Sequence, residues 1–263
     1  ISLIWCSASL ILLYSGLLLP DSRVTYQLLE PVTTLFFIYL ASIITIGFMI
    51  RTEQHIQNRH SLRITLIMIS ILLFISIYGV AVLTGSKANI LNSLSTANLI
   101  FFACMVGNWM TAPLKRPAEI VPLCIIVFFA DLFSVFAGPT KHLARNISEY
   151  YQGGMQGPPP IVDSLLVKVA VPGVEFLMPV FGVSDWIIIA FLSAAAHKFS
   201  LNDNILGKRL NETKLLSVFH FCPVALAGLI VSIMAARTAN IFLPALPFIV
   251  TLYLVFMMIK YPE

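Results

Sequence analysis

Charge is scarce in this sequence. Only 11% of its 263 residues are Asp, Glu, Lys or Arg, whereas 59% are hydrophobic, and the mean hydropathy is +0.92. A water-soluble domain of this length needs a far more polar surface. The composition therefore excludes a soluble globular protein and predicts an integral membrane protein whose surroundings are the lipid bilayer, with no nucleic-acid partner.

Several catalytic motifs are also absent. The sequence contains no H-E-x-x-H, no Walker loop and no G-x-S-G of the kind found in membrane serine proteases. Its four cysteines fall in apolar segments, without a C-x-x-C pair and without histidines at ligand spacing. We therefore expect neither a bound metal nor a cofactor.

Apolar runs long enough to cross a membrane recur along the whole chain. The pattern predicts an all-α polytopic membrane protein with eight transmembrane helices, and the start at Ile1 leaves room for a ninth helix upstream. The predicted spans are 1–20, 31–50, 64–84, 92–111, 119–138, 181–197, 215–236 and 240–259.

The basic residues are distributed unevenly between the predicted loops. Ten of the 16 Lys and Arg residues lie in the even-numbered loops or at the C-terminus, and three of the remaining six lie in one long loop, 138–180. Basic residues favour the cytoplasmic side, and long loops follow this rule poorly. A multi-pass protein with a cytoplasmic C-terminus and an outer long loop is predicted.

Two aspartates interrupt otherwise apolar segments. Asp131 lies within VFFADLFSVFAG and Asp185 within PVFGVSDWIIIAF. An aspartate at the centre of a membrane helix costs about 2.5–3.5 kcal/mol on insertion scales, so it usually marks a functional site. From the helical rise, Asp131 is about 18 Å and Asp185 about 20 Å from the cytoplasmic border. The two carboxylates are predicted to lie level on neighbouring antiparallel helices.

A facing pair of carboxylates has a known chemistry. In a low dielectric the two groups cannot both ionise, so they share a proton and titrate as a unit. Such a dyad can activate a water with one member and polarise a peptide carbonyl with the other. Ser184, beside Asp185, is a candidate for holding such a water, or for bonding its own helix backbone.

A third motif lies at the same depth. Leu246, in Pro244-Ala245-Leu246, is about 21 Å from the cytoplasmic border. With Asp131 and with Gly182-Val183-Ser184-Asp185, this order resembles the presenilin and signal peptide peptidase family of intramembrane aspartyl proteases, over residues 119–259.

The resemblance implies roles for these residues. Asp131 and Asp185 would be catalytic, and Gly182, Ser184, Pro244, Ala245 and Leu246 would contact substrate. The family has Tyr-Asp and Gly-x-Gly-Asp where this chain has Ala130-Asp131 and Gly182-Val183-Ser184-Asp185, so Ala130 replaces the tyrosine and Ser184 the second glycine. Both acids are present, so an active enzyme is expected. The predicted orientation is similar to signal peptide peptidase, which implies single-span proteins or remnant signal peptides as substrates.

These motifs divide the chain into N-terminal helices, 1–118, and C-terminal catalytic helices, 119–263, with a flexible loop at 139–180. The Gly- and Pro-rich segment 150–160 is predicted to be irregular. The β-branched segment after it predicts a short strand whose edge could pair with an unwound substrate. Val167, Val169 and Val171 are the candidates for this contact, and an interfacial loop without a partner is the alternative.

Two rival functions remain open at this point. In a proton- or cation-coupled transporter, Asp131 and Asp185 would bind the ion. In a non-catalytic homologue, the same surface would bind membrane helices without cleaving them. A prepilin peptidase also uses Gly-x-Gly-Asp acids but lacks the Pro-Ala-Leu motif, so this class is less favoured.

Overall fold

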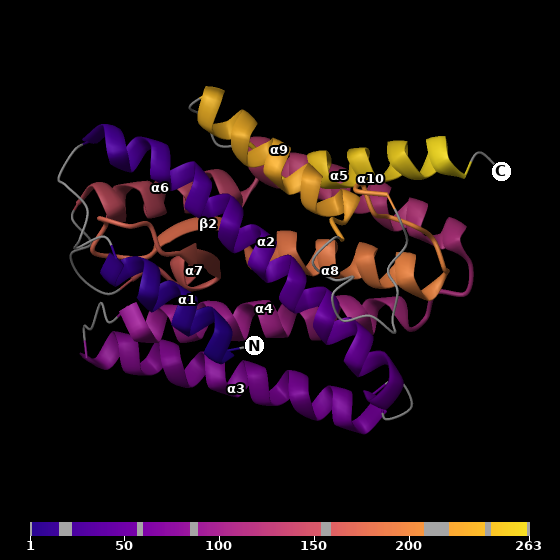
Figure 1. Ribbon diagram of the computed structural model, residues 1–263, viewed down its shortest axis with the longest axis horizontal. Helices are drawn as coiled ribbons and strands as arrows, with labels where there is room; N and C mark the ends of the chain where they lie inside the picture. The colour runs from indigo at the N-terminus through magenta and orange to yellow at the C-terminus, as the bar shows by residue number, and fades with distance from the viewer. Residues whose placement is uncertain are drawn as a thin grey trace.

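The structure is a computed structural model, which describes residues 2–15, 23–56, 60–84, 89–153, 159–207, 221–239 and 243–261. It is mostly helical (Figure 1). The N-terminal helices are α1 (Ser2–Ser15), α2 (Arg23–Ile56), α3 (His60–Thr84) and α4 (Asn89–Thr111). They are followed by η2 (Pro117–Glu119), α5 (Ile120–Phe136), α6 (Pro139–Gln152), α7 (Ile161–Ser164), β1 (Leu166–Val169), β2 (Met178–Gly182), α8 (Val183–Lys198), α9 (Val224–Ala239) and α10 (Leu246–Lys260).

Within the described part of the chain, four helical segments are long and apolar enough to cross a membrane. They are Leu29–Met49 in α2, Ser61–Leu83 in α3, Asn89–Thr111 in α4 and Pro117–Phe136, which spans η2 and α5. The described parts of α1, α9 and α10 are shorter apolar helices. A membrane protein is therefore indicated, whereas the count of eight spans and the side of the C-terminus stay predictions.

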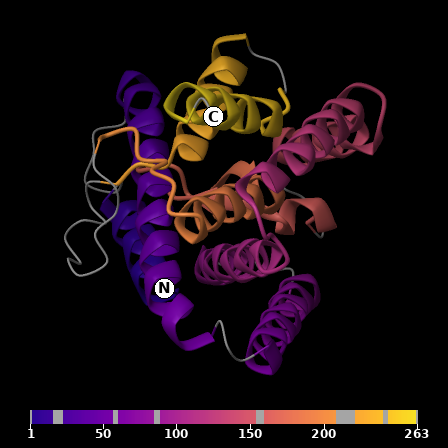
Figure 2. The ribbon, with the colours of Figure 1, turned by 90° about the vertical axis from the view of Figure 1, so that its right-hand side faces the viewer.

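The centre of the helical assembly is α4. This helix packs most extensively against α8 and also contacts α3 (Figure 2). It contacts α1 as well. A Cβ added at Gly107 of α4 would lie 2.7 Å from the Ala190 Cβ of α8, so the glycine allows the two backbones to approach. The large side chains of the core, including Trp186, Phe191 and Ile100, are fully buried around this contact.

A second tight contact joins α9 and α10. A Cβ at Gly228 of α9 would lie 2.5 Å from the Ile249 Cα of α10, which again permits close helix packing. α10 also packs on α5 and touches α8. This helix therefore connects the two segments that carry the aspartates.

The segment between the aspartates is more ordered than the sequence predicts. The expected flexible loop, 139–180, contains α6, α7 and β1 and the start of β2, all at one end of the helical assembly (Figure 1). Pro139 begins α6 at its first turn, where the missing N–H costs nothing. Residues 150–152 belong to α6, and residues 154–158 lie outside the described part of the chain.

Candidate active site

One cavity of about 600 Å³ contains both aspartates in its lining. Asp131 reaches it from the middle of α5, and Asp185 from the first turn of α8. The volume lies in the range of pockets that bind small molecules or short peptide segments. Two acids 54 positions apart in the sequence therefore face the same space.

The start of α8 holds Asp185. The backbone N–H of Gly182, the N-cap residue, donates a hydrogen bond to Oδ2 of Asp185 at 3.0 Å. Asp185 is the third residue of the helix, where free backbone N–H groups and the helix dipole attract a carboxylate. The side chain is half-buried and lines the cavity, and the bond from Gly182 fixes it to its own helix.

The start of α10 holds Asp131. The backbone N–H of Leu246 donates to Oδ2 of Asp131 at 3.1 Å. Pro247 follows Leu246 in the first turn, a position where helices tolerate proline. The Pro-Ala-Leu motif thus places a helix start against the first acid, and Pro244 and Ala245 also line the cavity.

The two aspartate-bearing helices do not form a packed pair. The sequence predicts them to be neighbours, but α5 packs mainly on α10 and α6, whereas α8 packs mainly on α4. Little direct contact is left between α5 and α8, and the cavity occupies the space between them. Because both helices contact α10, this last helix sets the spacing of the two acids.

The remaining lining is almost entirely apolar and was not identified from the sequence. Residues from α6, α7 and α9 take part: Leu143, Ile147, Val162, Leu229, Ser232 and Ile233. One sequence signal could have found the α6 contribution, because Leu143, Ile147 and Tyr151 recur at four-residue intervals and so share one helix face. An apolar cavity of this kind suits a hydrophobic chain.

The three valines proposed to contact substrate do not line the cavity. Val167, Val169 and Val171 are 0%, 0% and 1% exposed, and their side chains belong to the core. One edge of β1 pairs antiparallel with β2, and β1 also packs on α4, with Lys168 N–H donating to Thr96 Oγ1. The strand was therefore found in the sequence, but its predicted free edge is covered.

Most of the strand residues that line the cavity belong to β2, and β1 contributes only its first residue, Leu166. Pro179, Val180, Phe181 and Gly182 all contribute to the lining. A Cβ at Gly182 would lie 3.2 Å from Ser184 Oγ and 3.4 Å from Asp185 Oδ2, so a larger residue there would press on the acid. A segment held against the carboxylates would meet β2.

The two departures from the family pattern lie in different environments. Ser184 is exposed and lines the cavity, so its hydroxyl adds a polar group beside Asp185. Ala130 is exposed on α5 and is not part of the cavity lining. The serine is therefore the change that alters the site itself.

A buried contact behind Asp185 fixes the start of α8. Trp186 is fully buried, and its ring stacks on Phe181 with a centroid distance of 5.3 Å. Its indole Nε1–H donates to Thr45 Oγ1 of α2 at 3.0 Å, while the Thr45 hydroxyl donates to Ala41 O. Because Trp186 adjoins Asp185, α2 contributes to the orientation of the second acid.

Among the described residues, no group of three His, Cys, Asp or Glu side chains is arranged to hold a metal ion. The chain matches no family model, and comparison with curated proteins and with solved structures gives no match.

Proposed function

We propose that the protein is an intramembrane aspartyl protease that hydrolyses peptide bonds within transmembrane segments or remnant signal peptides. The observation that carries this proposal is the shared cavity, in which Asp131 and Asp185 face one apolar space with the start of α10 hydrogen-bonded to the first acid. The resemblance of the motifs to presenilin and signal peptide peptidase supports the same reading.

The chemistry follows from two carboxylates that share a proton. The ionised member takes a proton from water while the water oxygen forms a bond to the peptide carbonyl carbon. The protonated member donates a hydrogen bond, and then its proton, to the carbonyl oxygen. When the C–N bond breaks, a proton passes to the leaving nitrogen, so that one water gives one carboxylic acid and one amine.

The surroundings of the dyad suit a hydrophobic substrate. An unwound segment would lie along β2 and expose its backbone to the two acids, with its side chains against Leu143, Ile147 and Leu229. Extended peptides commonly bind by adding to a strand. The Ser184 hydroxyl lies beside Asp185, where it can hold the attacking water.

The test uses the purified protein with a synthetic signal peptide that carries a fluorophore and a quencher. We expect cleavage by the unaltered chain, inhibition by a hydroxyethylene mimic of the tetrahedral intermediate, and ¹⁸O from labelled water in the new carboxyl group. Loss of a proton or cation flux in Asp131→Asn, with no cleavage by any form, would favour a transporter. Peptide binding without cleavage would favour a non-catalytic homologue.

A further inference from the structure

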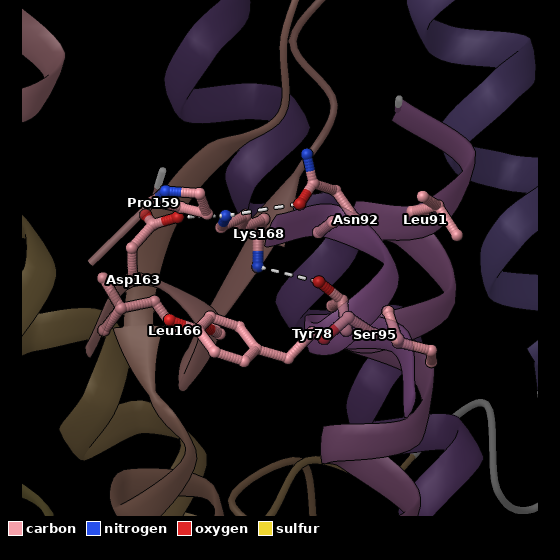
Figure 3. Close-up of a pocket in the computed structure, with 12 residues that line it drawn as sticks. Tyr78, Leu91, Asn92, Ser95, Pro159, Asp163, Leu166 and Lys168 are labelled. Atoms are coloured by element: carbon pink, nitrogen blue, oxygen red, sulfur yellow. Dashed lines mark hydrogen bonds and ion pairs between the residues drawn. The ribbon is translucent and has the colours of Figure 1, made fainter. Parts of the chain in front are cut away.

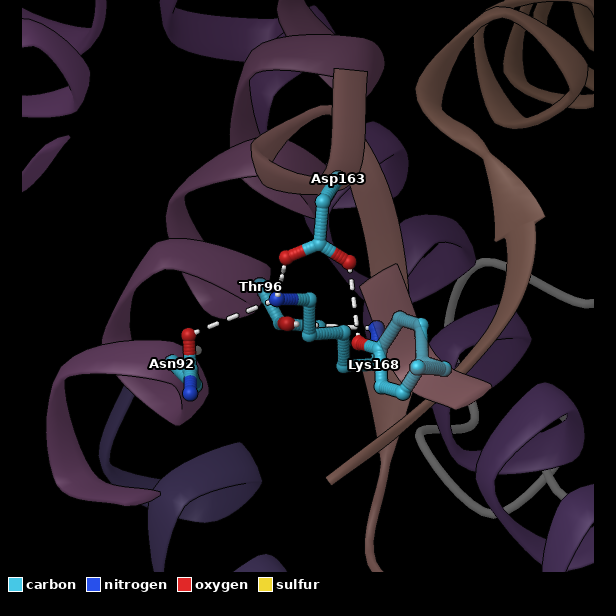
Figure 4. Close-up of polar contacts among 5 residues, drawn as sticks. Asn92, Thr96, Asp163 and Lys168 are labelled. Carbon is cyan, nitrogen blue, oxygen red and sulfur yellow. Dashed lines mark hydrogen bonds and ion pairs between the residues drawn. The ribbon is translucent and has the colours of Figure 1, made fainter. Parts of the chain in front are cut away.

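A buried ion pair lies beside the cavity and outside its lining. Lys168 of β1 and Asp163 of α7 are 6% and 2% exposed, and the Lys168 ammonium bonds directly to Oδ2 of Asp163 (Figure 4). Lysine and aspartate are rarely buried so completely. An apolar pair of the same volume is often as stable or more stable, so stability alone does not explain this one.

The pair connects four elements. Tyr151 OH of α6 donates to Oδ1 of Asp163 at 2.9 Å, and Lys168 Nζ donates to Asn92 Oδ1 of α4 at 3.5 Å. The Lys168 backbone N–H donates to Thr96 Oγ1, also on α4, at 3.3 Å. A continuous chain of polar contacts therefore runs from α6 through α7 and β1 to α4, the central helix.

Each element that the ion pair ties to α4 contributes to the cavity wall. Leu143 and Ile147 of α6, Val162 beside Asp163, and Leu166 at the start of β1 all line the cavity. α6 otherwise packs chiefly on α5, and its opposite face is exposed at Arg145. The bond from Tyr151 to Asp163 thus holds the far end of a helix that has few other neighbours.

The ion pair is shielded from bulk solvent, because both charged residues are buried. A pocket of about 30 Å³ beside it is lined by Tyr78, Asn92 and Ser95 together with both charged residues (Figure 3). Such a space holds about one water. The charges are therefore compensated mainly by each other and by their protein partners, which makes their relative position sharply defined.

We propose that Tyr151, Asp163 and Lys168 are positioning residues that fix the α6–α7 wall of the cavity at a set distance from the two aspartates. This inference rests on the proposed function, because the wall positioned in this way is the surface on which the substrate packs. Loss of the contact among Tyr151, Asp163 and Lys168 widens the cavity on the α6–α7 side. Substrate binding is then weaker, while the two aspartates stay in place.

The position of the wall can be measured without any activity. Spin labels at Asn146→Cys on the exposed face of α6 and Ile90→Cys on α4 report the distance between the two helices, in a background whose native cysteines are replaced by alanine. We expect a narrow distance distribution in the parent and a broad one in Tyr151→Phe and Lys168→Met. Arg145→Gln, which breaks the exposed Arg145–Glu149 pair on the same helix, is the control and should stay narrow.

Kinetics of peptide cleavage test the functional half of the inference. Tyr151→Phe removes one hydroxyl bonded to a charged group, and we expect KM to rise about tenfold with kcat nearly unchanged. The double variant Asp163→Leu with Lys168→Met replaces the ion pair by an apolar pair. Its unfolding temperature should be close to that of the parent, while its KM should stay raised. If the ion pair had only a structural role, both the unfolding temperature and KM of the double variant would equal those of the parent.

The outcomes separate this inference from the proposed function. A broad distribution in Tyr151→Phe together with no cleavage by the parent would retain the positioning role and reject the protease. A distribution in Tyr151→Phe and Lys168→Met as narrow as that of the parent, or an unchanged KM in an active enzyme, would overturn the positioning role.

Discussion

The backbone N–H of Leu246 donates a hydrogen bond to Oδ2 of Asp131, so the first residue of α10 is joined to a side chain 115 positions earlier in the sequence. A main-chain group cannot be removed by ordinary mutation, but it can be replaced. Incorporation of the α-hydroxy analogue of leucine at position 246 exchanges the N–H for an ester oxygen and keeps the side chain.

We expect this ester at Leu246 to lower kcat by about 10- to 100-fold, since a hydrogen bond to a charged group contributes about 1.5–3 kcal/mol. Cleavage of the quenched peptide measures the effect. The same exchange at Val250 breaks a bond within α10 that does not involve Asp131, and it should change the rate much less. Equal losses at both positions would mean that the contact with Asp131 has no special role.

The Thr45 hydroxyl is expected to support Asp185 through Trp186. Thr45→Val keeps the shape of the side chain but leaves the buried indole N–H without its acceptor, which costs about 1–3 kcal/mol. Both the unfolding temperature and kcat should fall. Ser42, one turn earlier on α2, is buried with no hydrogen-bond partner for its hydroxyl among the described residues, so Ser42→Ala is the matched control. A fall in stability with kcat unchanged would show that Thr45 does not support Asp185 in catalysis.

Close packing of α9 on α10 is expected to be required for the position of the Pro-Ala-Leu motif. Gly228→Ala places a Cβ against Ile249, and overpacking of this kind costs about 1–3 kcal/mol. We expect lower thermal stability in detergent and slower cleavage. Gly79→Ala on α3 adds the same atom where nothing lies within 4 Å, and it should leave both properties unchanged. Unchanged stability in Gly228→Ala would show that the helices separate at no cost.

Asp203, in the segment between α8 and α9, should make the stability depend on pH. Burial raises the pKa of this carboxyl to about 7, against smaller opposing effects of its own backbone N–H, His197 and Lys260. As the pH rises, the unfolded state, in which this carboxyl has a pKa near 4, releases its proton at a lower pH than the folded state does. The contribution of Asp203 to the free energy of unfolding is therefore expected to be largest below about pH 4 and to fall by about 1.4 kcal/mol per pH unit until about pH 7.

Asp203→Asn should remove this contribution, so the slope becomes shallower by about 1.4 kcal/mol per pH unit and the variant is more stable than the parent at pH 8, as measured by denaturant unfolding at several pH values. Glu149→Gln, which removes an exposed carboxylate, should keep the slope of the parent. A parallel pH dependence in the parent and in Asp203→Asn would contradict the assignment.

Part of this architecture could be read from the sequence because lipid imposes simple rules. Apolar runs located α2 to α5, and the cost of a buried charge singled out Asp131 and Asp185 before any fold was known. A β-branched run located β1, but which edge of the strand stays open depends on α4, far away in the chain. Val167, Val169 and Val171 were assigned to substrate for that reason, and they are core residues.

The helix neighbours were harder to predict. Antiparallel segments that follow one another usually pack together, yet α10 lies against both α5 and α8 and leaves a cavity between them. The close approach at Gly228 that makes this possible is a tertiary contact, and a lone glycine in an apolar helix does not reveal its partner. The sequence likewise does not reveal that Lys168 pairs with Asp163, because this ion pair depends on the tertiary fold.

We propose that Asp131 and Asp185 act as one catalytic unit. The most direct measurement compares cleavage of a single-span reporter in proteoliposomes by the unaltered chain, by Asp131→Asn, by Asp185→Asn and by the double variant. Groups that act together are strongly non-additive, so we expect each single variant to lose activity as completely as the double variant. Cleavage at the unaltered rate by either single variant would contradict the claim.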